Sequence, residues 1–175
     1  FSLGSKYFAK NENGIETLYC IWKKATPVSE FTYKDFEYPC PVKSEYAPDW
    51  QKNGVIITGY SGKAKEVVIP ETINGIKVTA VGKGAFRNKS NINTVKIPES
   101  VTSISSNAFY GCKNLASVIL GSSVKSIGSK AFSMCTSLTG INLQNVQTVG
   151  EHAFYGCKNL TNLYCGNALK VIGAY

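Results

Sequence analysis

The sequence VTSISSNAFYGCKNLASVILGSS at 101–123 sets the pattern of this chain, because the residues that follow repeat it. The next copies read VKSIGSKAFSMCTSLTGINLQN at 124–145 and VQTVGEHAFYGCKNLTNLYCGNA at 146–168, and an earlier copy begins at Val78. Four phenylalanines mark the period, at separations of 23, 23 and 22 residues: Phe86, Phe109, Phe132 and Phe154. A fixed period of this length is typical of a solenoid built from stacked repeats.

Every copy contains two short apolar segments. One ends in two apolar residues that flank a single position, as in Val95/Ile97 and Val118/Leu120, and this alternation indicates a strand with one buried face. The other opens the copy, as in Val101/Ile104. The Ala-Phe segment between them has a length that suits one or two turns of α- or 3₁₀-helix. Because no copy buries its own apolar side chains, like strands are expected to pair at about 4.8 Å around one continuous core.

This template resembles the leucine-rich repeats of the BspA-like type, also described from treponemal surface proteins. The resemblance covers roughly 55–175. It rests on the V-x-x-I segment, the Ala-Phe pair, the L-x-x-V-x-L strand and the cysteine three residues after the Phe: Cys112, Cys135 and Cys157. Lys89 replaces that cysteine in the first copy, and the third copy lacks one turn residue before Val146. The resemblance implies a mainly β, right-handed leucine-rich-repeat solenoid with short helical or 3₁₀ turns, and adhesin-like attachment to host matrix proteins, other cells or surface components.

Residues 1–54 differ in kind from the repeats. They hold 11 of the 20 aromatic residues, including Trp22 and Trp50, and show no internal repeat. The run after Asn13-Gly14 predicts a hairpin strand, since Asn-Gly suits a two-residue turn with positive φ. We expect residues 1–54 to form a β-rich aromatic cap on the first edge of a solenoid at 55–175, with about four to five repeats. An alternative use of these aromatics is a binding face.

Length and composition limit the number of domains and the class of protein. A chain of 175 residues suits one domain, or a domain with a cap. It contains no run of about 18 apolar residues, so no transmembrane segment is expected. Because the chain begins at Phe1 without Met, we interpret it as a mature or trimmed form whose signal peptide has been removed. The missing signal peptide therefore says nothing about secretion, and an extracellular or cell-surface location is what the family resemblance implies.

The net charge of +8 belongs to the repeats. Residues 1–54 contain seven lysines and seven acidic residues, whereas 55–175 contain twelve basic and four acidic residues. A basic array attracts polyanions such as nucleic acid, acidic glycans or anionic surfaces. Nucleic acid is disfavoured, because Arg87 is the only arginine and base reading favours the arginine fork. Lysines at turn positions, such as Lys113 and Lys158, also suit a solvated edge that resists aggregation.

The six cysteines form three groups. Those at the repeat position are expected to form an internal column of inert thiols, and the absence of CxxC pairs argues against a metal site. Cys165 replaces an apolar strand residue and is expected to be buried likewise. Cys20 and Cys40 lie in the cap, and a possible disulfide between them would suit an extracellular protein, stabilising the cap by roughly 3 kcal/mol.

No catalytic constellation emerges from the sequence. His152 is the only histidine, and it occupies a variable repeat position that predicts contact with solvent. Cys157 is five residues away but belongs to the expected core column, so a Cys-His nucleophile would contradict the packing. Glycines recur at 82, 128, 150 and 173 and are interpreted as marking a tight bend. We therefore expect no enzyme activity, no cofactor and no metal.

Because no catalytic site is expected, we expect the protein to act by binding a partner through its surface. One position on each expected strand points outward, which predicts a column across the sheet: Val68, Lys96, Ile119, Asn142 and Tyr164. Solenoids commonly use such a column for binding, although an ordinary solvated sheet face would have the same arrangement. The leading hypothesis is a non-catalytic secreted or surface-displayed module that binds an extracellular protein or glycan. The alternatives are a carbohydrate-binding accessory, with Trp22 and Trp50 stacking on sugar rings, and a structural spacer in a surface layer.

Overall fold

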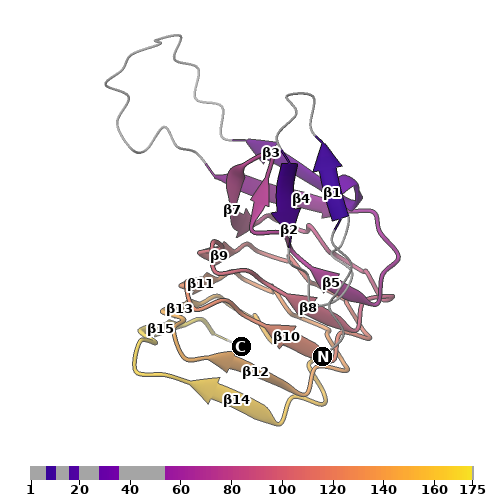
Figure 1. The fold of residues 1–175 in the computed structure, drawn as a ribbon. Coiled ribbons are helices and arrows are strands. Elements are labelled where there is room, and N and C mark those ends of the chain that lie inside the picture. The colour runs from indigo at the N-terminus through magenta and orange to yellow at the C-terminus, as the bar shows by residue number, and fades with distance from the viewer. Residues whose placement is uncertain (1–6, 11–15, 20–27, 36–53, 175) are drawn as a thin grey trace, which may run out of the picture.

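The computed structural model describes residues 7–10, 16–19, 28–35 and 54–174 (Figure 1). Within them the chain is nearly all strand, and successive repeats stack as the turns of a solenoid. The mainly β solenoid expected from the repeat pattern is confirmed. Two sheets run along the stack, and a third side is made of turns.

The first sheet has five parallel strands, one from each stacked turn of the chain. Its order is β14-β12-β10-β8-β5, so neighbours in space are neighbours in the repeat series. The strands are β5 (Glu66–Val68), β8 (Thr94–Lys96), β10 (Ser117–Ile119), β12 (Gly140–Leu143) and β14 (Asn162–Cys165). These are the segments in which alternating apolar residues predicted strands.

The second sheet contains the strands that open each copy. They are β7 (Ile76–Val81), β9 (Ser103–Ile104), β11 (Ser126–Ile127), β13 (Thr148–Val149) and β15 (Val171–Ile172), paired in parallel. The hairpin strand β6 (Thr72–Ile73) pairs with β7 across Asn74 and Gly75, whose φ angles of 52° and 78° are those of a primed turn.

Strands from the N-terminal side cover the first edge of this second sheet. β4 (Val55–Tyr60) runs parallel to β7, and β3 (Phe31–Asp35) is antiparallel to β4, after a 3₁₀ turn, η1 (Val28–Glu30). A separate antiparallel pair joins β1 (Tyr7–Lys10) to β2 (Glu16–Tyr19), as the hairpin interpretation predicted, but Lys10 pairs with Glu16, so the connection is longer than the expected two residues. The division of the chain at residue 54 stays a prediction.

The third side carries the Ala-Phe segments. The N–H of Phe86 donates to the carbonyl of Ala108 in the next copy at 2.7 Å, and that of Phe109 donates to Ala131 at 2.7 Å. Between these bonds lie i→i−3 bonds within each copy, such as Arg87 N–H to Gly84 at 3.0 Å. Hydrogen-bonded turns stand here in place of the α- or 3₁₀-helix that the segment length suggested, because alternate amides bond to the adjacent copy instead of continuing into a helix.

The variable position before each Ala-Phe pair has a left-handed backbone. Its φ is 68° at Gly84, 59° at Asn107, 57° at Lys130 and 55° at His152. Glycine and asparagine adopt this region most readily, which explains two of the four residues. The four copies share this conformation although their side chains differ, and His152 is partly exposed there.

The phenylalanines form the centre of the core. Phe86, Phe109 and Phe132 are fully buried, and their rings stack with centroids 4.8 and 5.1 Å apart. At the N-terminal end Tyr60 continues the column, 5.2 Å from Phe86, and Phe31 of β3 lies 5.4 Å from Tyr60. Residues before the repeats therefore cover the first aromatic ring of the stack.

Two interpretations of the sequence need correction. Cys165 is exposed, not buried, because β14 is the outermost strand of its sheet and no described residue covers it; Leu163 on the same strand is 44% exposed. The recurring glycines do not make a bend by positive φ. A Cβ at Gly128 would lie 2.5 Å from the backbone nitrogen of Ser106, so glycine is required there for close approach of neighbouring copies.

Candidate functional site

The five candidate binding residues lie in one row across the five-stranded sheet. The registers pair Val68 with Lys96, Lys96 with Ile119, and Asn142 with Tyr164. The register between β10 and β12 pairs Ser117 with Gly140, which places Ile119 beside Asn142 two residues further on. We call this row the strand row. It exists because each strand contributes the same repeat position.

Alternation along each strand turns this row outward. The residues immediately before it are buried, with exposed fractions of 0% for Val95 and 7% for Val118. In the row itself, Ile119 is 52% exposed and Tyr164 is 73% exposed. Lys96 and Asn142 are also exposed, and Val68 is partly buried. The row therefore offers two large apolar side chains together with a cation and an amide.

A second row runs beside the first and is small and polar. It is formed by the residues two positions earlier on each strand, aligned by the same registers: Thr94, Ser117, Gly140 and Asn162. A Cβ at Gly140 would touch the side chain of Asn162 at 3.2 Å. Thr94, Ser117 and Gly140 have small or no side chains, so they project little from the sheet beside the strand row.

A shallow hollow of about 200 Å³ lies where the strand row meets the following turns. Asn142 of the row lines it, together with Glu99, Ser122 and Asn145. The Glu99 carboxylate accepts hydrogen bonds from the N–H and the hydroxyl of Ser122, both at 2.6 Å. These bonds lower the pKa of Glu99, the side-chain bond most of all. Repeat patterns alone did not single out this hollow, because Glu99 and Asn145 occupy positions that differ between copies.

The cysteine column has no nucleophilic character. The thiols of Cys112, Cys135 and Cys157 donate to the carbonyls of Phe86, Phe109 and Phe132 at 3.0 to 3.1 Å. Burial raises the pKa of Cys112 to about 12 and that of Cys157 to about 11, and it raises the pKa of Cys135 as well. A thiolate is the reactive form of cysteine, so these groups are chemically inert at neutral pH.

The histidine stands apart from these thiols. The ring of His152 contacts the edge of Tyr155, with centroids 5.7 Å apart. In the part of the chain that the structure describes, no three His, Cys, Asp or Glu side chains gather closely enough to hold a metal ion. The strand row can therefore bind a partner through its exposed side chains. The described residues include no assembled catalytic group.

Several predicted site residues lie outside the described residues. These are Trp22 and Trp50, proposed for binding, and Cys20 and Cys40, proposed as a disulfide. The structure thus brings together the strand row and leaves the aromatic cap face and the disulfide as predictions. In the described residues, no helix has the length and apolar character needed to cross a membrane.

Known proteins share both the repeat and the fold. The family model described as BspA type leucine rich repeat region matches residues 60–175, in six copies. A solved leucine rich repeat protein of T. pallidum is similar with a TM-score of 0.74 and 34% identity, covering 86% of this chain and 64% of that one. No curated protein matches the chain.

More distant structures share the fold. A leucine-rich repeat protein from Bacteroides ovatus has a TM-score of 0.61 and 26% identity, covering 85% of this chain and 37% of that one. The pneumococcal vaccine antigen PcpA has a TM-score of 0.62 at 20% identity, covering 85% of this chain and 40% of that one, and shows the fold alone. The chain spans less than two thirds of the length of these three structures.

Proposed function

Because the chain belongs to the family of BspA type leucine rich repeat proteins, we propose that it is a non-catalytic binding module that recognises a protein through the strand row. The proposal includes a secreted or cell-surface location and an adhesin-like role toward host or matrix proteins or other surface components. Both of these parts rest on the family resemblance.

One observation supports the proposal most directly. Ile119 and Tyr164 are 52% and 73% exposed in the middle and at the end of a flat parallel sheet. The two side chains lie in one row with Asn142 between them, and Tyr is enriched among the residues that dominate binding energy at interfaces. A merely solvated strand row would be expected to be more polar.

The size of the face determines how such binding works. Five strands at about 4.8 Å, each presenting three residues at about 3.3 Å, make a face of roughly 240 Å². A standard protein interface buries about 800 Å² on each partner. The strand row is therefore the centre of a larger contact that includes neighbouring turns, or binding is weak at one site and strengthened by display of many copies.

The test measures binding to a panel of purified extracellular-matrix proteins on a biosensor. We expect saturable binding to at least one of them, and we expect Tyr164→Ala with Lys96→Glu to raise Kd about tenfold or more. The matched control is Tyr155→Ala with Lys125→Glu, which makes the same two substitutions at an exposed tyrosine and an exposed lysine outside the strand row. The control should change Kd by less than about twofold.

Two results would contradict the proposal. One is the absence of saturable binding across the panel; the other is an equal loss in both double variants. Melting temperatures of all variants are measured alongside, because the four side chains are exposed and their replacement should leave the fold intact.

A further inference from the structure

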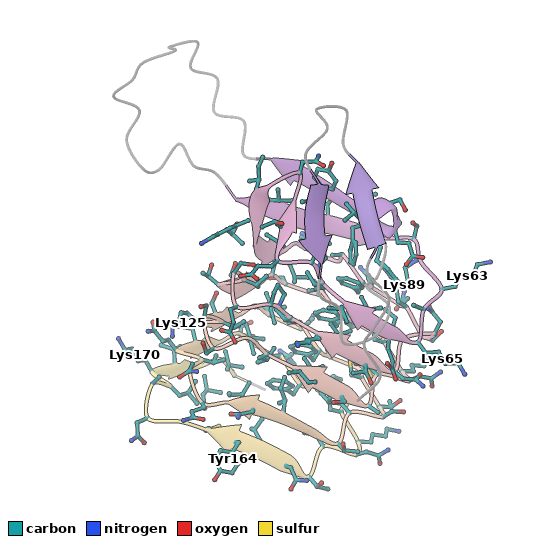
Figure 2. All side chains as sticks on the ribbon, viewed as in Figure 1. Lys63, Lys65, Lys89, Lys125, Tyr164 and Lys170 are labelled. Atoms are coloured by element: carbon teal, nitrogen blue, oxygen red, sulfur yellow. The ribbon has the colours of Figure 1, made fainter. Side chains whose placement is uncertain are left out.

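Basic residues are distributed unevenly around the stack. One side consists of the turns that lead into the five-stranded sheet, which we call the lysine edge: 62–66, 87–93, 110–116, 133–139 and 155–161. These turns contain one acidic residue, Glu66, and six basic residues: Lys63, Lys65, Arg87, Lys89, Lys113 and Lys158. Figure 2 shows Lys63, Lys65 and Lys89 on this side of the sheet.

The opposite edge has a different balance. It consists of the turns that leave the five-stranded sheet: 70–77, 98–102, 121–125, 144–147 and 166–170. These turns contain three basic residues, Lys77, Lys125 and Lys170, and two acidic residues, Glu71 and Glu99. Lys125 and Lys170 lie on this far side in Figure 2. The lysine edge therefore carries a formal charge of +5, against +1 for the opposite edge.

Hydrogen bonds hold the turns of the lysine edge in a regular stack. The side-chain amide of Asn91 donates to the carbonyl of Ala64 at 3.2 Å, and that of Asn114 donates to Ser90 at 2.6 Å. The Thr136 hydroxyl donates to the carbonyl of Lys113 at 3.2 Å. Five turns at about 4.8 Å place the charges along a line about 19 Å long.

The charged groups on this line are accessible. Lys63, Lys65, Lys113 and Lys158 are exposed, and Lys89 is partly exposed. Lys113 and Lys158 occupy the same repeat position two copies apart, about 10 Å along the stack. A stacked backbone that carries basic side chains on four of its five turns suits a linear polymer with repeated anionic groups.

We propose that the lysine edge binds a linear anionic polysaccharide through its sulfate or carboxylate groups, as a second site separate from the strand row. Lysine ammonium groups act as point charges, which suits anionic groups that vary in position along a glycan. The exposed ring of Tyr155, 53% exposed on the last of these turns, adds an apolar surface for a sugar ring.

Nucleic acid fits this edge less well. Base reading favours arginine, and Arg87 lies over the ring of Tyr110, 5.0 Å from its centroid. Binding to single strands also relies on successive exposed aromatic platforms, whereas Tyr110 is partly buried. The lysine edge therefore has the charge for a polyanion without the groups that recognise bases.

The test uses heparin as the sulfated probe, hyaluronan as the carboxylated probe, and dextran as the uncharged control, at 0.15 M NaCl. At that ionic strength exposed charges interact over only about 8 Å, so local contacts dominate. Lys113→Glu with Lys158→Glu should raise the Kd for heparin by about tenfold or more and lower its salt dependence. Lys113→Gln with Lys158→Gln should produce a smaller loss in the same direction.

A closely matched control exists on the opposite edge. Lys125→Glu with Lys170→Glu makes the same change of charge at two exposed positions that are also two copies apart. It should change the Kd for heparin by less than about twofold, and Lys113→Arg with Lys158→Arg should retain binding. The Lys113/Lys158 variants should also weaken binding of any protein ligand of the strand row much less than Tyr164→Ala with Lys96→Glu does, which separates the two proposals.

Several outcomes would overturn the lysine-edge proposal. They are the absence of binding to both anionic glycans, binding to dextran of similar strength, and equal losses in the two glutamate variants, which would indicate general charge attraction. Binding of oligothymidylate as tight as that of heparin would replace the glycan with nucleic acid. If Lys113→Glu with Lys158→Glu lowers the melting temperature, the Kd for heparin of Lys113→Gln with Lys158→Gln is used instead. An unchanged Kd in that glutamine variant would also reject the proposal.

Discussion

The rings of Phe109 and Phe132 lie parallel to within 2°, with centroids 5.1 Å apart. Both are fully buried, and each occupies the same position in its repeat. The contact therefore joins two copies across their common interface, and the same stacking continues to Phe86 and Phe154. Stability in such an array comes from the contacts between neighbouring copies.

Phe132→Ala should lower the free energy of unfolding by about 3–5 kcal/mol, because it removes a buried ring and leaves a cavity between two copies. Urea denaturation followed by circular dichroism measures this change. Tyr155→Ala is the control, since Tyr155 is 53% exposed and its loss should cost much less. A cost below about 1 kcal/mol for Phe132→Ala would show that this ring does not support the stack.

Phe31→Ala tests whether the N-terminal strand β3 is part of the same cooperative unit. Phe31 is 4% exposed and contacts Tyr60 and Phe86, so we expect a loss of about 3–5 kcal/mol in a single unfolding transition. An early separate transition in the variant, with the repeats melting at the wild-type temperature, would indicate that β3 unfolds independently.

Gly128→Ala should destabilise the protein by about 1–3 kcal/mol, as overpacking does. The added Cβ would lie 2.5 Å from the backbone nitrogen of Ser106, and that backbone has to move. Ser105→Ala is the matched control, because Ser105 occupies the same repeat position and already carries a Cβ. Equal effects of the two substitutions would reject the close-approach explanation.

Thiol reactivity should separate the exposed cysteine from the buried ones. Iodoacetamide at pH 8, followed by peptide mapping, should label Cys165 rapidly and leave Cys112 and Cys135 unmodified in the native protein. The reason is that the thiolate reacts, while burial raises the pKa of Cys112 to about 12. Labelling of Cys112 at the rate seen in urea would contradict the buried column.

The same burial predicts a loss of stability at alkaline pH. The pKa of Cys112 rises from 9.0 to about 12 on folding, and that of Cys157 rises from 9.0 to about 11. Above pH 9 the unfolded chain releases these protons and the folded chain retains them, so the free energy of unfolding falls from pH 9 toward pH 12. Replacing both cysteines with alanine should make the decline between pH 8 and 10.5 shallower; an unchanged decline would rule out these thiols as a cause.

Periodicity was sufficient to predict the strand row. Four of its five residues lie ten positions after a Phe of the repeat, and parallel pairing of equivalent segments then aligns them. The same reasoning identified the buried Cys column, because a residue that recurs at one repeat position meets its equivalents in the next copy. It was wrong about Cys165, since position in the repeat does not say whether another strand covers that copy.

Local sequence rules were less informative about the glycines and the variable position. The glycine at 128 suggested a bend, yet what it avoids is a clash with Ser106 in the neighbouring copy. Lys130 has a left-handed φ although lysine is not among the residues enriched in that region. The glycine and the left-handed position both depend on contacts between copies. The sequence of a single copy gives no information about those contacts.

Repeat identity in the amino-acid order is therefore enough to establish the solenoid, its period and the side of each strand that faces outward, because burial alternates along a strand and equivalent positions stack. Three-dimensional packing decides the rest. It determines which copy lies at an exposed edge, where a hollow forms beside Asn142, and how nine of the twelve basic residues of 55–175 divide into one strongly charged edge and one nearly balanced edge. These properties depend on contacts between residues that are distant in the chain. They exist only because each copy packs directly against the next one.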